Sequence, residues 1–464
     1  MDAALVVVVF AGLSVLTGEV GGPVEALPIL FFARMLALAR SGTYHHARSL
    51  ADPSDLSRIA SWIAVASLVG YVTDWLVLRS LEIGFAVVET ATVLLVLIAL
   101  RLVLAALGVV RRAPPEIERR DRPVTEPSEL ESMLTALEQA PEIYQPSRFW
   151  ETLNRRHLEL LFDESDFRNF KRTVNRSYFQ FGAVAFVKSL PLLLATWLRH
   201  PDRRVLTATV VGQSGFRARV LAILLSLYAN AVRRRPGGDL LDRVAEPEVG
   251  NPIAVRYGDR FITEDLCHSV EEYASIMTGL PAGHRVRRAM EIGAGYGRLA
   301  FVFAVASPQI QYHIVDIPPA LYVSQRYLTT VLPEVPAFTF RPFERYEQVS
   351  AEMARARFVF LEPQQLEKLP DDYADLMLTV STLHEMRADQ ILHYLHVVDR
   401  LCGGAFYSKQ WRRFYNDLDD ITPTRETYPI PLRWSLVFER SALVPRTFFE
   451  ALYLCRAGVH GLDR

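Results

Sequence analysis

Cysteine is scarce in this sequence, because Cys267, Cys402 and Cys455 are far apart in a chain of 464 residues. Their spacing matches no metal-ligand pattern, and an odd, sparse count favours a reducing compartment over a disulfide framework. We therefore expect neither a metal site nor a fold held together by disulfides.

An excess of charge is also missing. The 51 Lys and Arg residues are balanced by 52 Asp and Glu residues, which leaves a net charge of -1. Proteins that bind nucleic acid usually carry an excess of positive charge, so we expect no nucleic-acid partner. The length suggests two to three structural units.

Apolar residues are concentrated in the first third of the chain, in runs at 3–17, 27–39, 59–79 and 84–110. The last run is long enough to span a bilayer core of about 30 Å. Arginines follow it and also lie in the stretch 40–58, and such basic flanks are typically cytoplasmic. Residues 1–112 are therefore expected to hold transmembrane helices in the inner membrane, with the rest of the chain in the cytoplasm. Buried helices of a soluble domain are the alternative.

The remaining chain divides into three predicted parts. Prolines among dense charges at 113–128 indicate an exposed linker. Residues 129–245 show a mostly amphipathic helical pattern, in which the apolar run 179–198 is interpreted as a buried helix, with a further membrane span as the alternative. The last part, 246–464, changes character, because strand-like and helix-like runs alternate from Ala289 onward.

That alternation predicts an α/β, Rossmann-like domain with a mostly parallel sheet and crossover helices. The runs 433–440 and 446–454 are expected to be the final, antiparallel strands. The other expected strands are 288–292, 311–316, 357–361, 375–380 and 404–409, and the expected helices are 298–306, 319–330 and 388–401.

The run from Ala289 to Ala300 is the most informative for function. An apolar, strand-like start leads into Glu291 and then into three alternating glycines, Gly293, Gly295 and Gly297. Glycines at this spacing allow a tight turn and let a ligand lie against bare main chain. Asp316 closes the next strand-like run, about 20 residues later, where a ribose hydroxyl would need an acceptor.

Two cofactor classes fit this loop. Counted from Gly295, the dinucleotide fingerprint G-x-G-x-x-G/A is satisfied through Ala300, so a dinucleotide stays possible. However, Glu291 two residues before the first glycine gives E-x-G-x-G-x-G, which resembles motif I of S-adenosylmethionine (SAM) methyltransferases. Glu291 would hold the loop in shape or face the amino-acid end of the cofactor. A glycine-rich turn without a ligand is the third interpretation.

Further segments resemble one family, the bacterial sugar O-methyltransferases, over residues 140–455. They are Tyr144–Trp150, Asn169–Val174, Asn251-Pro252, Asp265 with His268-Ser269 and Glu272-Tyr273, Asp316–Leu321 and Ser381–Met386. The resemblance implies SAM as cofactor and methyl transfer to a hydroxyl of a sugar or glycan precursor. Other acceptors, such as a lipid or small metabolite, and a non-catalytic membrane-anchored scaffold that binds SAM remain alternatives.

A sugar hydroxyl is a weak acid, so methyl transfer to it benefits from a base. His384 is the first candidate, since it follows the strand-like run 375–380 and open α/β sheets bind ligands at the carboxyl ends of their strands. Its ordinary pKa of about 6.5 suits a base at neutral pH. Glu385 is expected to orient the base or to accept the proton itself. A His384 that only packs against the sheet is the alternative.

Four other residues are candidate contacts. Gln364 follows the third strand-like run, and its amide offers a donor and an acceptor to an adenine edge. Lys409 ends a strand and is a candidate for substrate binding, with a strand-end side chain satisfied within the protein as the favoured alternative. Asp265 and His268 have helical spacing and are expected to bind the substrate or the cofactor's amino-acid end. With Glu272 they give three possible ligands at helical spacing, but a fourth ligand is lacking, so a metal ion is not expected there.

Overall fold

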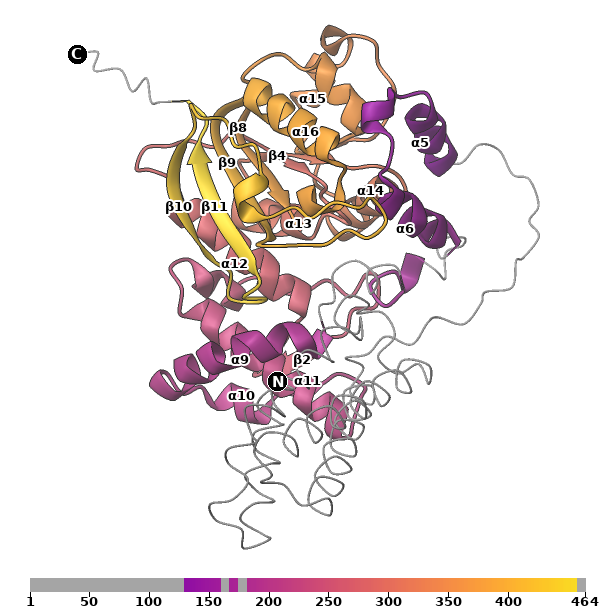
Figure 1. Ribbon diagram of the computed structural model, residues 1–464. Coiled ribbons are helices and arrows are strands. Elements are labelled where there is room, and N and C mark those ends of the chain that lie inside the picture. The colour runs from indigo at the N-terminus through magenta and orange to yellow at the C-terminus, as the bar shows by residue number, and fades with distance from the viewer. Residues whose placement is uncertain (1–128, 160–166, 174–181, 457–464) are drawn as a thin grey trace, which may run out of the picture. The chain divides into compact units, whose positions relative to one another are not determined.

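The computed structural model describes residues 129–159, 167–173 and 182–456 (Figure 1). The predicted membrane region 1–112 and the linker 113–128 lie outside the described residues. No helix within the described ranges is long and apolar enough to cross a membrane. The run 179–198 is therefore not a candidate span in its described part, helix α9 (Gly182–Arg199), which buries Phe186 and Leu193.

The strands of the second half of the chain form one eight-stranded sheet. Its order is β10-β11-β9-β8-β4-β5-β7-β6, and β11 runs antiparallel to both of its neighbours while the other pairs are parallel. The strands are β4 (Arg288–Ile292), β5 (Gln311–Val315), β6 (Ala337–Phe338), β7 (Phe358–Leu361), β8 (Ala374–Val380), β9 (Cys402–Trp411), β10 (Ser435–Ser441) and β11 (Phe448–Leu454). The predicted Rossmann-like α/β domain is confirmed, including its antiparallel end.

The strand order reverses at β4. The chain passes from β4 to β5 on one side, whereas β8, which comes later in the sequence, pairs with β4 on the other side. In open α/β sheets a crevice forms at the carboxyl ends of the strands at such a switch point, and ligands bind there. The topology alone therefore places the expected site just after β4, where the glycines lie.

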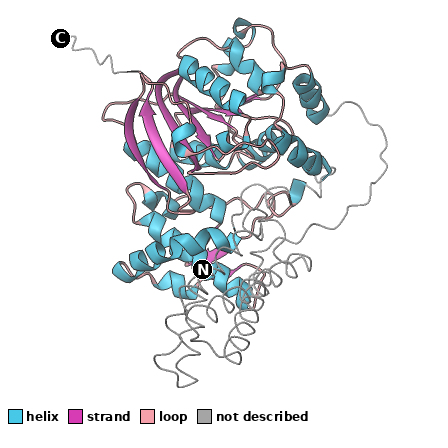
Figure 2. Ribbon diagram, in the orientation of Figure 1, coloured by secondary structure: helices cyan, strands magenta, loops and turns pink. Residues whose placement is uncertain are grey.

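Helices cover both faces of the sheet (Figure 2). One core joins β4 Ala289 and β5 Ile314 to α12, α13 and α14, and the other joins Met290 and Ile292 to α16 and α15. Alternate residues of a strand point to opposite faces, so both faces of β4 are buried. The helices are α12 (Glu264–Gly279), α13 (Arg298–Ala306), α14 (Ala320–Val331), α15 (Ser350–Met353) and α16 (Ala388–Leu401), with 3₁₀ turns η4 (Tyr346–Gln348), η5 (Pro363–Lys368), η6 (Leu383–Glu385) and η7 (Arg425–Thr427).

The earlier described residues form helices around a small second sheet. Helix α11 packs between α9 and α12, and β1, β2 and β3 form an antiparallel sheet beside it. The elements are α5 (Glu129–Glu138), η2 (Glu142–Tyr144), α6 (Arg148–Glu159), α10 (Arg203–Thr207), β1 (Thr209–Val210), α11 (Phe216–Arg233), η3 (Gly238–Asp242), β2 (Val255–Tyr257) and β3 (Arg260–Ile262). Residues 123–464 belong to one compact unit, and the division at residue 245 stays a prediction.

Candidate cofactor site and catalytic residues

The glycine loop, residues 293–297, connects β4 to α13. All three of its glycines have positive φ, 76° at Gly293, 58° at Gly295 and 81° at Gly297. A Cβ atom on Gly293 would lie 2.2 Å from Thr382 Cγ2, and one on Gly297 would lie 2.8 Å from Leu328 Cδ1. Backbone conformation and close packing therefore both require glycine at these positions.

A cleft opens at the carboxyl edge of the sheet beside this loop. Its volume is about 590 Å³, including the open solvent at its mouth. Among the described residues that line it, Asp316 is the only one with a charged side chain. The lining residues are Tyr144, Gln145, Pro146, Ser147, Trp150, Ile292, Gly293, Gly295, Val315, Asp316, Ile317, Pro363, Ser381, Thr382, Met386, Gln390 and Tyr394. The predicted loop glycines Gly293 and Gly295 thus meet Asp316 in one cleft.

Asp316 sits directly after β5 and faces the loop across the switch point. One carboxylate oxygen accepts a hydrogen bond from the Gly295 amide at 2.7 Å, and the other accepts from the Ile317 amide at 2.8 Å. Burial raises the pKa of this carboxyl to about 7. Each carboxylate oxygen has a second lone pair, so Asp316 can hold the loop and still accept from ligand hydroxyls.

Part of the cleft lining comes from a segment much earlier in the chain. We call residues 142–150 the strap, and it supplies five of the lining residues. The Gln390 side chain donates to the carbonyls of Ile143 at 3.0 Å and Gln145 at 2.7 Å. Ser147 Oγ donates to the Glu385 carbonyl at 2.8 Å. These bonds fix the strap to the segment that was predicted to be catalytic.

Asp419 fixes the other end of the strap, because its two oxygens accept from the Arg148 and Phe149 amides at the start of α6. A carboxylate is favoured at a helix N-terminus, where backbone amides are unsatisfied. No site role was predicted for the strap residues. The available signal was the family-like segment Tyr144–Trp150, which was assigned to the family and not to the site.

The predicted catalytic pair lies beside the cleft, and neither side chain lines it. His384 is fully buried, with Nδ1 3.0 Å from Gln410 Oε1 and its ring against Phe414 at 4.7 Å between centroids. Its Nε2 lies 3.6 Å from Glu385 Oε1. Burial raises the pKa of Glu385, whose side chain is 15% exposed. Of the two, Glu385 is the residue with some access to solvent.

Gln364 does not face the cleft. Its side-chain amide donates to the Ala136 carbonyl at 3.4 Å and to Glu362, so it ties η5 to α5. Its neighbour Pro363 lines the cleft instead. Glu362, at the end of β7, is fully buried, and burial raises its pKa to about 8. The sequence analysis missed this carboxyl, although an acidic residue at a strand end was a usable signal.

Glu291 is buried within the sheet, on β4 just before the glycine loop. Its position in β4 turns it to the face that carries α12 and α13, and its carboxyl accepts from Tyr312 Oη at 2.8 Å. Burial raises its pKa to about 8. Glu291 does not line the cleft, so the geometry gives no support for direct contact with the cofactor, and its hydrogen bond with Tyr312 joins β4 to β5; the loop-holding role stays a prediction.

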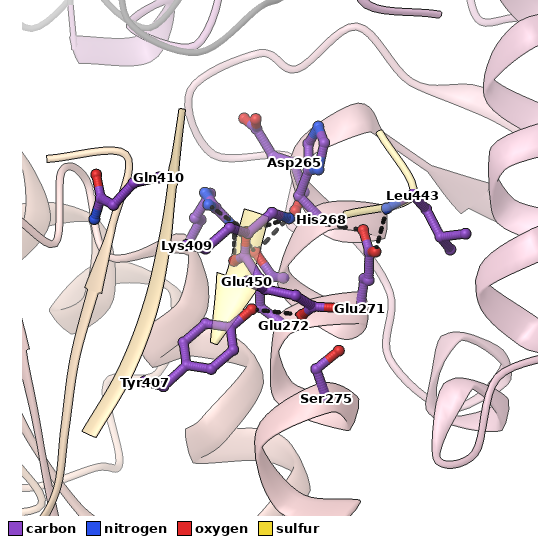
Figure 3. Close-up of polar contacts among 12 residues, drawn as sticks. Asp265, His268, Glu271, Glu272, Ser275, Tyr407, Lys409, Gln410, Leu443 and Glu450 are labelled. Carbon is purple, nitrogen blue, oxygen red and sulfur yellow. Dashed lines mark hydrogen bonds and ion pairs between the residues drawn. The ribbon is translucent and has the colours of Figure 1, made fainter. Parts of the chain in front are cut away.

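The three predicted substrate contacts are buried together on the α12 face, away from the cleft lining (Figure 3). Asp265 accepts from Tyr296 Oη at 2.9 Å, and His268 Nδ1 lies 2.8 Å from Tyr228 Oη. Lys409 Nζ donates to Glu272 at 3.0 Å. Each of the three thus has its own partner within the protein, as a buried charge requires. The structure therefore indicates internal support and not substrate contact.

Glu272 is the centre of that buried network. Burial opposes its ionisation, but the charges of Arg298 and Lys409 hold its pKa below the ordinary value. Burial likewise opposes a charged Lys409, while Glu272 and Glu271 keep its pKa raised. Both groups are therefore charged at neutral pH. No cluster of three His, Cys, Asp or Glu residues within the described ranges could hold a metal ion.

Comparisons with known proteins give similarity in structure only. No family model matches the chain, and no curated protein matches it. A SAM-dependent methyltransferase from Aquifex aeolicus is 12% identical over 40% of this chain and 89% of its own, with a TM-score of 0.27.

Two further solved structures are similar over parts of the chain. A SAM-dependent methyltransferase from Leishmania major is 15% identical over 49% of this chain and 80% of its own, with a TM-score of 0.28. Phosphoethanolamine N-methyltransferase 1 from Haemonchus contortus, solved with phosphoethanolamine and S-adenosylhomocysteine, is 15% identical over 44% of this chain and 45% of its own, with a TM-score of 0.29. The function proposed below rests on the geometry of the cleft.

Proposed function

We propose that this chain is a SAM-dependent methyltransferase. The observation that carries the proposal is the meeting of Gly293, Gly295 and Asp316 in one cleft at the switch point of the sheet. Bare main chain lets a cofactor approach closely, and the carboxyl can accept hydrogen bonds from ribose hydroxyls. The apolar lining residues Ile292 and Val315 suit the flat face of a base.

The charge of the cleft favours SAM over a dinucleotide. A dinucleotide brings a pyrophosphate with two negative charges, while SAM carries a cationic sulfonium and an ammonium group. The charged side chain in the described lining is the acidic Asp316. The nearest loop cation, Arg298, turns away and donates to Glu272 at 2.6 Å. The described lining therefore offers a pyrophosphate no cationic side chain to pair with, which favours the cationic cofactor.

When bound, SAM would supply an activated methyl group on a good leaving group. The protein must then mainly hold the acceptor in line with the methyl group. The strap and the segment Ser381–Met386 both border the cleft, and Ser147 Oγ donates to the Glu385 carbonyl and so joins them. They would form the wall that positions the acceptor and excludes water.

For the acceptor we propose a hydroxyl of a sugar or glycan precursor. Three of the segments that resemble the sugar O-methyltransferase family, 144–150, 316–321 and 381–386, each contribute residues to the cleft lining. Their convergence on one cleft supports the resemblance. If residues 1–112 hold the protein at the inner membrane, the cytoplasmic catalytic domain would lie close to lipid-linked glycan intermediates.

We assign the role of base to Glu385, with His384 as its positioning residue. Glu385 is partly exposed, and its neighbour Met386 lines the cleft. Its raised pKa makes the ionised form a stronger base than an ordinary carboxylate. The buried His384 ring is fixed by Gln410 and lies beside the Glu385 carboxyl.

Turnover tests the proposal. Full-length protein is incubated with methyl-labelled SAM and cell-envelope extract, and the labelled product is then treated with glycosidase or lipase. Label released with sugar fragments supports the glycan acceptor, whereas label in a lipid or small metabolite supports a methyltransferase for another acceptor. SAM binding without any labelled product would favour the scaffold, and no SAM binding would refute the proposal.

A further inference from the structure

The glycine loop has a second side that faces into the protein. Tyr296, between Gly295 and Gly297, is only 6% exposed, and its hydroxyl donates to Asp265 at 2.9 Å. Arg298, the first residue of α13, donates to Glu272 at 2.6 and 3.1 Å. It also donates to Ser269 at 2.9 Å.

The three acceptors belong to one face of helix α12. Asp265, Ser269 and Glu272 are spaced i, i+4 and i+7, so they form one stripe along the helix. Figure 3 shows Asp265 and Glu272 on this helix beside Lys409, which donates to Glu272 at 3.0 Å. One helix face thus binds the loop on both sides of Gly297, while Lys409 balances the charge of Glu272 from β9.

We propose that α12 clamps the glycine loop, and that Tyr296 and Arg298 are positioning residues for the cofactor. The inference rests on the proposed function and adds how its loop is held. Free glycines lose more conformational entropy on ordering than other residues. When the loop is already ordered in the free protein, cofactor binding does not incur this entropy cost, so the affinity is higher.

Residues before the glycine loop, together with α14, also pack against the Tyr296 ring. Phe170 and Tyr327 approach this ring edge-on at 5.3 and 5.2 Å between centroids. Lys171 Nζ lies 5.1 Å from the ring centre and pairs with Glu246 at 2.5 Å. Tyr296 is therefore enclosed by residues from before and after the glycine loop, which makes the helical region part of the cofactor site's support.

A matched pair of variants separates positioning from general stability. Tyr296→Phe removes one hydroxyl and keeps the ring packing. Tyr407→Phe removes the same kind of bond, because the buried Tyr407 hydroxyl donates to Glu450 of β11 at 2.9 Å and not to an α12 acceptor of the loop. Both variants are made in the full-length protein, and SAM affinity is measured by calorimetry alongside the melting temperature.

Both variants should lower the melting temperature to a similar extent. Only Tyr296→Phe should weaken SAM binding, by about tenfold, and raise the KM for SAM by the same factor with kcat unchanged at saturation. Tyr407→Phe should leave the SAM affinity within about twofold. If Tyr296→Phe does not fold, Arg298→Lys tests the other anchor, since it keeps the charge but loses the two-nitrogen contact with Glu272.

The outcomes distinguish the two proposals. If the wild-type protein binds SAM and both tyrosine variants bind it equally well, the clamp is wrong while the methyltransferase stands. If the wild-type protein does not bind SAM at all, the proposed function fails and the clamp fails with it. Weakening of SAM binding in Tyr407→Phe to the same degree would also overturn the clamp, because loss of stability alone would then explain it.

Discussion

Asp316→Asn is the most informative single substitution at the cleft. Each carboxylate oxygen of Asp316 accepts from a backbone amide, at 2.7 Å from Gly295 and 2.8 Å from Ile317. Asparagine has only one oxygen, so its NH2 group must face one of these two donors. The substitution removes the negative charge, leaves one buried amide without an acceptor and loosens the loop at Gly295.

The expected magnitude follows from these losses. A hydrogen bond to a charged group contributes roughly 1.5–3 kcal/mol, and a tenfold change in Kd corresponds to about 1.4 kcal/mol. Loss of one ribose contact should therefore weaken SAM binding by roughly 10- to 100-fold. Asp375→Asn is the control, because Asp375 Oδ2 alone accepts from the Arg287 and Arg288 amides at the other edge of the sheet.

The pH dependence of SAM affinity, measured by titration calorimetry, tests the role of Asp316 independently. The ionised carboxyl is the acceptor, and the pKa of Asp316 in the free protein is raised to about 7 by burial. SAM affinity should therefore increase as the pH rises from 6 to 8 in the wild type and stay level in Asp316→Asn. An Asp316→Asn protein that binds SAM as tightly as the wild type at pH 8 would refute the assignment of this carboxyl to the cofactor.

Three further outcomes are expected. Burial raises the pKa of Glu291 and Glu362 to about 8, so above about pH 6.5, where histidines are neutral in both states, the folded state holds more protons than the unfolded state. The free energy of unfolding should therefore fall from about pH 6.5 to 8, by up to ~1.4 kcal/mol per pH unit and group, and chemical denaturation that shows a rise over this range contradicts this. Glu385→Gln should lower turnover by roughly 10²–10⁴-fold with SAM affinity intact, and a larger loss in His384→Gln would exchange their roles. Residues 59–110 should keep the full-length protein in the membrane pellet after carbonate extraction, whereas its release would favour buried helices.

Local signals explain what the sequence predicted well. The strand 288–292, the three glycines and Asp316 are adjacent or nearly adjacent features, and each has a strong conformational preference. The parallel strands could be placed because both faces of such a sheet are buried, which makes their strands continuous apolar runs. The two-residue strand β6 was missed, since so short an element has no pattern of its own.

The direction of each side chain was not predictable in the same way. Lys409 and His384 both lie near strand ends at the correct edge of the sheet, yet each is turned away from the cleft by distant partners. Lys409 is drawn to Glu272 from α12, and His384 is held by Gln410 and Phe414. Gln410 is 26 residues from His384 in the sequence, and Glu272 is 137 residues from Lys409. Local propensity and spacing do not reveal partners at such distances.

The strap was not predicted to be part of the site, because distant side chains determine its position. Tyr144 and Ser147 lie more than a hundred residues before the glycine loop in the sequence, yet they line its cleft. Their position depends on Gln390 and Asp419, which hold the strap by side-chain bonds to its backbone. Such bonds leave no periodic signal in the sequence, and only the resemblance to a family drew attention to this segment.

Equilibrium binding of SAM to the purified full-length protein tests the central claim most directly. Calorimetry with SAM, S-adenosylhomocysteine and NAD⁺ on the same preparation compares the two cofactor classes that the glycine loop allows. We predict saturable binding of one SAM per chain, competition by S-adenosylhomocysteine and no measurable binding of NAD⁺. Binding of NAD⁺ with none of SAM, or of neither, would contradict the account.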